Sequence, residues 1–191
     1  DGFVTALAPD GSTIVHSTLV GGAIRQSGGT FDSVKGVVSA PDGSTYLAGA
    51  TVSVNFPTTV GGIDPVTDPG VNALLVHLDG SGVAILSSTV FGGRMAETAD
   101  GIARASDGDV ILAGSTTSDD FPTTPGCVDS TFNSPGLNDV FVVRLSPDCA
   151  VLRFGTYLGG AEHDYGTSVT VDSTGAAFVT GTTTSVDYPT T

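Results

Sequence analysis

Residues 114–124 read Gly-Ser-Thr-Thr-Ser-Asp-Asp-Phe-Pro-Thr-Thr, and two further segments of the chain are built the same way. Residues 49–59 and 181–191 also begin with glycine and end with Phe-Pro-Thr-Thr or Tyr-Pro-Thr-Thr, at the same spacing of 10 residues. The dipeptide Gly-Gly recurs as well, with separations of 71 and 67 residues, at 21–22, 92–93 and 159–160. Self-similarity with a period of this length predicts a stacked or radial array of one supersecondary unit.

Each unit reads as four short β-strands. Asp-Gly and similar pairs lie between β-branched runs, and this pattern favours hairpins because glycine accepts the positive φ of a tight turn. With 27 glycines and 10 prolines, no window has the pattern of an amphipathic helix. The first strand of a unit is expected at 36–39, 101–104 and 168–171, and the second at 45–50, 110–115 and 176–182. The third strand is expected at 3–7, 74–78 and 140–145, and the fourth at 13–20, 83–91 and 151–158.

Several of these strands are apolar on both faces, as in Val110-Ile111-Leu112-Ala113. A sheet with one solvent-exposed face would instead have strands in which apolar and polar residues alternate. Four-stranded antiparallel sheets covered on both faces are the blades of a β-propeller. A β-sandwich would not repeat itself at this period, and a parallel β-helix has a shorter repeat. The sequence therefore predicts an all-β propeller-type array of four-stranded antiparallel blades. Eight residues are expected in its core: Val4, Leu7, Leu47, Leu78, Leu112, Val142, Leu145 and Val179.

The third unit resembles a known bacterial repeat family. The residues that carry the resemblance are 141–148 (Phe-Val-Val-Arg-Leu-Ser-Pro-Asp), 156–160 (Thr-Tyr-Leu-Gly-Gly), 164–166 (Asp-Tyr-Gly), 171–172 (Val-Asp), 179–181 (Val-Thr-Gly) and 188–191 (Tyr-Pro-Thr-Thr). In this order they are similar to the SBBP repeat, the seven-bladed β-propeller repeat, and three copies cover the chain. The first copy departs most, because it carries an insertion between Gly22 and Gly36. The resemblance implies a secreted or surface-exposed bacterial or archaeal propeller array, and it brings no catalytic residues.

The chain begins on a third strand and ends just after a second strand. Its expected units are a half-blade at 1–22, blades at 23–93 and 94–160, and a half-blade at 161–191. The two half-blades are complementary, but closed propellers have 4 to 8 blades and this chain supplies three. We therefore expect either an excerpt of a longer protein or several chains that combine, into a ring or, by head-to-tail contacts, into a filament.

The two outermost strands of this arrangement are apolar edges. Unpaired strand edges in natural proteins are protected by lysines or inward charges, and the only lysine here, Lys35, is distant from both ends of the chain. We expect the N-terminal half-blade to pair antiparallel with the C-terminal half-blade of another copy. The residues expected at this assembly seam are Phe3, Val4, Leu7, Ala177, Phe178 and Val179.

Charge and hydropathy restrict the partners. The net charge is −14, from 20 acidic and 6 basic residues, and this argues against nucleic acid, which needs clustered lysines and arginines. Further copies or flanking repeats, glycans and other proteins remain as partners. No apolar run is long enough to insert in a membrane. The absence of an initiator methionine and of a signal peptide suits a mature or excerpted exported segment.

The two cysteines lie in the same unit. Cys127 follows the second Pro-Thr-Thr, and Cys149 takes a turn position where glycine is expected. A disulfide between them would stabilise the blade by roughly 3 kcal/mol and would fit an oxidising compartment. Two separately buried thiols are the alternative reading. We predict the disulfide.

Acidic residues gather in the loops at one end of the blades. Carboxylates there either hydrogen-bond the loop backbone or hold calcium, which takes 6 to 8 oxygen ligands. The candidate calcium ligands are Asp119, Asp120, Glu162 and Asp164. No other cofactor is expected. The histidines His16, His77 and His163 occupy three different repeat positions, so no catalytic constellation is predicted and the chain is not expected to be an enzyme.

The sequence thus predicts an extracellular structural or adhesive propeller module that assembles with further copies, for instance into a filament or surface layer. Two alternatives stay open. One is a closed propeller, dimeric or part of a longer chain, that binds glycan or protein on its long-loop face. The other is the non-catalytic propeller domain of a secreted enzyme.

Overall fold

The structure is a computed structural model, and it describes residues 1–22, 32–59, 63 and 70–191. These residues form β-strands, turns and loops, with no helix among them. Accordingly, the described chain contains no helix long and apolar enough to cross a membrane. The strands are β1 (Gly2–Leu7), β2 (Ile14–Val20), β3 (Ser33–Ser39), β4 (Thr45–Thr51), β5 (Asn72–Leu78), β6 (Ile85–Phe91), β7 (Glu97–Arg104), β8 (Val110–Thr116), β9 (Asp139–Leu145), β10 (Leu152–Leu158), β11 (Asp164–Val171) and β12 (Ala177–Thr183).

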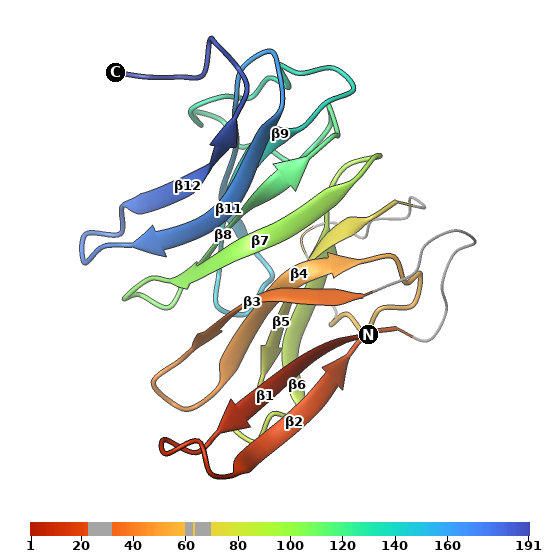
Figure 1. Ribbon diagram of the computed structural model, residues 1–191, viewed down its shortest axis with the longest axis vertical. Coiled ribbons are helices and arrows are strands. Elements are labelled where there is room, and N and C mark those ends of the chain that lie inside the picture. The colour runs from red at the N-terminus through yellow and green to blue at the C-terminus, as the bar shows by residue number, and fades with distance from the viewer. Residues whose placement is uncertain (23–31, 60–62, 64–69) are drawn as a thin grey trace.

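The strands pair into four antiparallel sheets. Two of these have four strands, in the orders β3-β4-β5-β6 and β7-β8-β9-β10, and two have only two strands, β1-β2 and β11-β12. Figure 1 shows the sheets following one another in chain order, from β1-β2 at the bottom to β11-β12 at the top. The predicted all-β fold of antiparallel sheets is confirmed. Within the described residues the sheets form an open stack that does not close into a ring.

Tight turns between the strands require a left-handed backbone, as the Asp-Gly pairs predict. Gly11, Gly82 and Cys149 occupy the same turn of three successive repeats, with φ of 70°, 71° and 60°. The aspartate of these turns bonds the turn itself: Asp10 accepts the backbone N–H of Ser12, and Asp148 accepts that of Ala150. Cys149 therefore holds a conformation that is ordinary for glycine and uncommon for other residues.

The first strand of each complete unit begins earlier than its sequence pattern predicts. β7 begins at Glu97 instead of residue 101, and a β-bulge shifts its register between Ala99 and Gly101. The bulge breaks the apolar alternation by which a strand is found in sequence. Opposite it, a Cβ on Gly114 would lie 1.8 Å from the Thr98 carbonyl oxygen, so only glycine fits there. A Cβ on Gly49 would likewise lie 1.8 Å from the Ser33 carbonyl oxygen. This close approach of two strands explains why glycine recurs at this position of the repeat.

The core lies between successive sheets. The largest cluster joins the two four-stranded sheets, with Ala48 and Leu75 from one and Leu112 and Val143 from the other. A smaller cluster, containing Val20, joins β1-β2 to the next sheet, and another, containing Val169, joins β11-β12 to the sheet before it. Burial at both faces is what a stack of blades requires.

The predicted core is correct at six of eight positions. Val4, Leu47, Leu78, Leu112, Val142 and Leu145 are buried. The prediction is wrong at Leu7, which is 59% exposed, and at Val179, which is only partly buried. Both lie in the two-stranded sheets, where the neighbouring strands that cover their repeat equivalents are absent from this structure.

Candidate functional site

A buried carboxylate fastens each pair of successive sheets. Glu97 begins β7, and its carboxylate accepts hydrogen bonds from the backbone N–H of Gly93, from Thr116 Oγ1 and from Ser118 Oγ. Gly93 follows the last strand of the preceding sheet, whereas Thr116 and Ser118 follow the second strand of the sheet that Glu97 itself begins. Burial raises the pKa of Glu97, although these donors favour its charged form.

The same arrangement occurs in the other two units. Asp32 accepts from the Gly22 N–H, from Thr51 Oγ1 and from Ser53 Oγ, and Asp164 accepts from the Gly160 N–H and from Ser185 Oγ. Burial of Asp32 disfavours its charged form, but the hydrogen bonds that the carboxylate accepts outweigh the effect of burial and lower the pKa of Asp32. We call this recurring group the carboxylate staple, and it explains why Gly-Gly is repeated: a Cβ on Gly92 would lie 2.0 Å from Glu97 Oε2.

Sequence reasoning missed the staple, although its signal is present. Thr-x-Ser follows the recurring glycine at 51–53, 116–118 and 183–185, and an acidic residue precedes each first strand. The acid of the first copy, Asp32, lies beyond an insertion. The sequence places it with Glu97 and Asp164 as a loop acid displaced by that insertion, but it does not show that the three carboxylates bind the same donors.

The candidate calcium ligands do not form one group. Asp119 and Asp120 both pair with Arg94, at 3.1 and 2.9 Å. Asp164 belongs to the carboxylate staple of the next unit, and the Glu162 backbone N–H bonds Ser185 Oγ. In the described part of the chain, no three His, Cys, Asp or Glu side chains are grouped so that they could hold a metal ion. The calcium expectation stays a prediction.

The two cysteines are free in this structure, which differs from the predicted disulfide. Cys149 is buried, and its Sγ lies 3.2 Å from Ser87 Oγ on the adjacent sheet. Cys127 is partly exposed, in a loop that is fixed to β10 by Thr124, which donates its N–H to the Gly155 carbonyl. The thiol of Cys149 thus points into the packing between sheets, where burial raises its pKa to about 11.

The Pro-Thr-Thr motif clamps the outermost strand of each complete sheet. The N–H of Thr124 bonds the carbonyl of Gly155 on β10, and Thr124 Oγ1 accepts the N–H of the same residue. Thr59 makes the same two bonds with Ser88 on β6. In the third copy of the repeat, the equivalent threonine is Thr191.

The two-stranded sheets leave apolar strands uncovered. Every residue of β8 is buried, whereas its repeat equivalent β12 has no fully buried residue, and Phe178 is 57% exposed. At the opposite end of the stack, Phe3 on β1 is 68% exposed. Ala177 is exposed, while Val4 is buried within the molecule. Five of the six residues predicted at the seam therefore lie wholly or partly at the surface.

β1 and β12 hold complementary positions in the strand order of a complete sheet. In the complete sheets, the second strand pairs with the third: β4 pairs with β5, and β8 pairs with β9. By its place in the repeat, β12 corresponds to a second strand and β1 corresponds to a third strand. The two strands lie at opposite ends of the molecule (Figure 1). In this structure they are therefore not paired with each other, and each strand has one unpaired edge.

Alternate backbone N–H groups of β1 face its unpaired edge. The N–H of Ala8 bonds the Thr13 carbonyl across the β1–β2 hairpin. Because backbone N–H groups alternate sides along a strand, those of Phe3, Thr5 and Leu7 point away from β2. They point toward the edge where the second strand of a complete blade would lie.

Comparison with known proteins identifies the repeat. Residues 153–189 match the family model SBBP, described as a beta-propeller repeat. The matched segment runs from β10 through β11 and β12 to the Tyr-Pro of the recurring motif, so it spans the connection between two successive sheets. The chain has no match among curated proteins. The resemblance seen in the sequence is thus confirmed over residues 153–189, which match the SBBP β-propeller repeat.

Proposed function

We propose that the chain is a structural module that joins copies of itself by sharing a blade, with β11-β12 of one copy completed by β1-β2 of the next. One observation carries this proposal: β4 and β8 are buried in complete sheets, while the equivalent β12 is exposed. An apolar strand with unpaired N–H and C=O groups is a ready template for strand addition.

The internal sheets supply the register of the shared blade. On β8 and β9, Val110 faces Leu145, Leu112 faces Val143 and Gly114 faces Phe141. Transferred by repeat equivalence, the proposed pairs are Ala177 with Leu7, Val179 with Thr5 and Gly181 with Phe3. Each pair exchanges two backbone hydrogen bonds, because the N–H groups of Phe3, Thr5 and Leu7 point to this edge.

The Pro-Thr-Thr motif of the third copy fits the same arrangement. Thr59 clamps Ser88 on β6 and Thr124 clamps Gly155 on β10. The repeat equivalent of these two strand residues at the N-terminal end is Ser17 on β2. In the shared blade, Thr191 of one copy therefore clamps Ser17 of the next.

The proposed module is extracellular and has no catalytic role. The SBBP repeat supports a scaffold, and the net charge of −14 disfavours nucleic acid as a partner. The buried carboxylates at Asp32, Glu97 and Asp164 are engaged by backbone and hydroxyl donors, as structural groups are.

Sedimentation velocity over a micromolar concentration series tests the proposal. We expect the wild-type chain to form species larger than one copy and Thr5→Pro to sediment as a monomer, since proline removes an N–H from the seam edge. Thr5→Val is the matched control, because it also loses the bond from Thr5 to Ser17 but keeps the backbone N–H. Circular dichroism checks that all three chains remain folded.

A folded wild-type monomer at every concentration would overturn the proposal, as would equal assembly of Thr5→Pro and wild type. Rings and filaments in electron micrographs would both support it, because both require the shared blade. An arrangement in which chains meet through their long loops predicts instead that Thr5→Pro assembles normally.

A further inference from the structure

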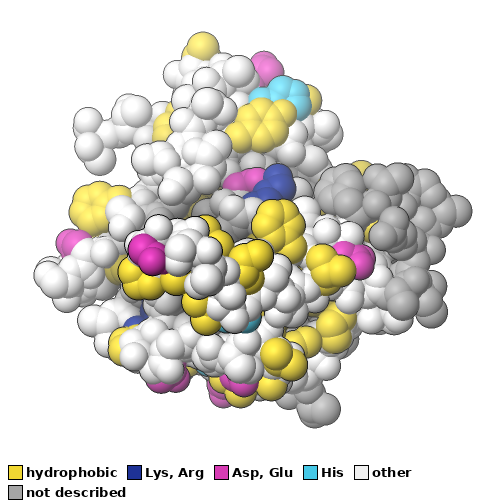
Figure 2. All heavy atoms as spheres, turned by 60° about the horizontal axis from the view of Figure 1, so that its bottom comes forward, with side chains coloured by type: hydrophobic (Ala, Val, Ile, Leu, Met, Phe, Trp, Pro, Cys, Tyr) yellow, Lys and Arg dark blue, Asp and Glu magenta, His cyan; other side chains and the backbone are white. Residues whose placement is uncertain are grey.

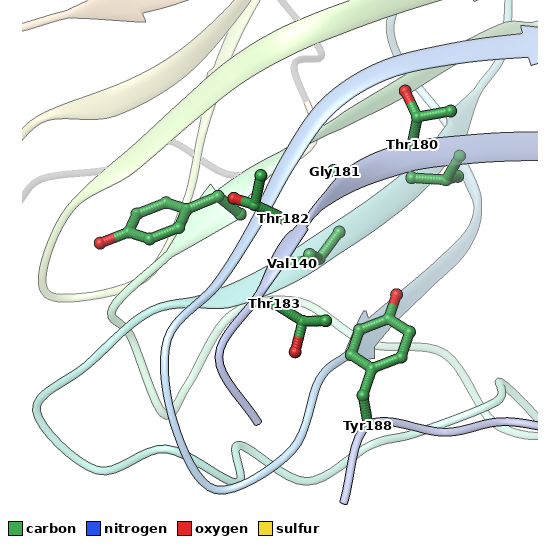
Figure 3. Close-up of a pocket in the computed structure, with 8 residues that line it drawn as sticks. Val140, Thr180, Gly181, Thr182, Thr183 and Tyr188 are labelled. Atoms are coloured by element: carbon green, nitrogen blue, oxygen red, sulfur yellow. The ribbon is translucent and has the colours of Figure 1, made fainter. Parts of the chain in front are cut away.

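A cavity of about 220 Å³ lies beside the exposed strand β12. Figure 3 shows Tyr188 rising from the C-terminal segment toward Thr183 and Val140, with Gly181 and Thr182 on the opposite side. Its lining residues carry no charge: Val140, Tyr165, Val179, Thr180, Gly181, Thr182, Thr183 and Tyr188. The cavity is thus formed by the C-terminal half-blade together with β9 of the sheet beneath it.

The repeat equivalent of this position is filled between the two complete sheets. There Phe141 is fully buried and stacks on Phe121 with ring centroids 4.6 Å apart, while Phe91 meets Phe141 edge-on at 6.2 Å. Phe141 lies opposite Gly114 in the strand register. A phenylalanine from a third strand thus occupies the space beside the glycine of the second strand.

Three residues around that space have counterparts that line the cavity. Gly181 corresponds to Gly114, Tyr188 corresponds to Phe121, and Val140 corresponds to Ala73. The counterpart of Phe91 is Leu158, which packs in the apolar cluster between the same two sheets. What the cavity lacks is the equivalent of Phe141 itself.

That equivalent is Phe3, at the opposite end of the molecule. Phe3 is 68% exposed, on the same outward face of the N-terminal half-blade as Leu7 and Leu19, which is 72% exposed. Their equivalents between the complete sheets, Leu145 and Tyr157, are buried in one cluster with Phe141. Figure 2 shows hydrophobic side chains gathered over this end of the molecule.

We propose that the cavity is the receptor for Phe3 of a second copy. The inference rests on the proposed function and names the residue that anchors one copy to the next. Phe3 enters the cavity beside Gly181 and packs on the ring of Tyr188, while Leu7 and Leu19 cover Val140 and its neighbours. A large aromatic side chain that leaves water for a preformed, uncharged cavity is a typical hot spot of an interface.

Sedimentation equilibrium of Phe3→Ala and Tyr188→Ala tests the anchor. We expect either substitution to weaken self-association at least about tenfold, as truncation of an interface hot spot does. The matched control is Val128→Ala, which truncates an equally exposed apolar residue in a loop outside the half-blades and leaves self-association unchanged. The melting temperature of dilute Phe3→Ala stays close to the wild-type value, because Phe3 is mostly exposed in the single copy.

A second readout follows Phe3 directly. The chain contains no tryptophan, so Phe3→Trp places a single reporter at the proposed anchor. Its emission is expected to shift to shorter wavelength as the protein concentration rises, and Tyr188→Ala in the same chain is expected to abolish the shift.

The outcomes separate the anchor from the shared blade. If Thr5→Pro prevents assembly while Phe3→Ala and Tyr188→Ala assemble like wild type, the receptor cavity is wrong and the shared blade stands. If the wild-type chain does not assemble, both are wrong.

Discussion

Phe121 stacks on Phe141 with ring planes inclined by 26°, and Phe121 is the aromatic residue of the recurring Phe-Pro-Thr-Thr motif. Phe121 follows the second strand of its sheet, and Phe141 belongs to the third strand of that sheet. The motif therefore places an aromatic ring against the third strand, and its final threonine clamps the fourth strand. A blade is complete only when all three parts are present.

Truncation of Phe141 measures the packing in a complete blade. We expect Phe141→Ala to lower the free energy of unfolding by about 3–5 kcal/mol, because a fully buried aromatic side chain is lost and a cavity remains. Urea denaturation of the dilute chain measures the loss. Phe3→Ala, which truncates the exposed equivalent, is the internal control and should change the free energy by less than about 0.5 kcal/mol. A loss below about 1 kcal/mol for Phe141→Ala would contradict the packing described here.

Removal of one staple donor tests the buried carboxylate. Ser118→Ala leaves Glu97 with fewer donors in a buried site, at an expected cost of about 1–3 kcal/mol. The hydroxyl favours the charged carboxylate, so its loss raises the folded-state pKa of Glu97 above its already raised value.

The pH dependence of this cost has a definite sign. A carboxyl with a raised folded-state pKa contributes stability below its unfolded-state pKa, and that stability is lost as pH rises through the folded-state pKa. The destabilisation by Ser118→Ala should therefore be larger at pH 8 than at pH 4, when both chains are unfolded by urea at each pH. Ser173→Ala, in an exposed turn, is the control without such a trend. An equal cost at both pH values would show that Glu97 holds its proton throughout.

Thiol reactivity separates the free cysteines from a disulfide. We expect one thiol per folded chain, Cys127, to react readily with a disulfide reagent at pH 8, and Cys149 to react only after unfolding, since it is buried with a raised pKa. Cys127→Ser should leave no readily reactive thiol. If no thiol reacted in unfolded, unreduced protein, the disulfide predicted from the sequence would be present.

The strand order and the turns could be predicted from the sequence because their signals are local. Asp-Gly pairs mark the turns. At Cys149 the glycine is replaced, but the turn is still predicted because the neighbouring residues match those of the other copies. The start of β7 and the staple at Glu97 could not be predicted in the same way. A bulge interrupts the alternation there, and the partners of Glu97 lie in two separate segments, at Gly93 and at 116–118.

The prediction of burial was wrong at the two ends of the array, and the reason is physical. Leu7 and Val179 have the same local pattern as buried residues in the complete sheets, so the sequence predicts them in the core. Whether they are buried depends on a strand that one copy does not supply. The seam was predicted because strand order alone makes β1 and β12 complementary, but the cavity and the role of Phe3 required side-chain packing.

Site-directed cross-linking between two differently labelled chains tests the shared blade most directly. By repeat equivalence with Ile111 and Arg144, Phe178 on β12 lies opposite Ala6 on β1 of the next copy, at a position where paired residues do not exchange hydrogen bonds. Cα atoms at such positions lie about 4.5 Å apart, which suits a disulfide. Both chains carry Cys127→Ser, one carries Ala6→Cys and the other Phe178→Cys. In the control, Leu7→Cys replaces Ala6→Cys, and its side chain points to the opposite face of the strand.

The account predicts that mixing and mild oxidation yield a covalent dimer of one chain of each kind, with residues 6 and 178 joined in its peptide map and little product from the Leu7→Cys control. Absence of the dimer, or equal yield from the control pair, would contradict the pairing of β1 with β12 of another copy.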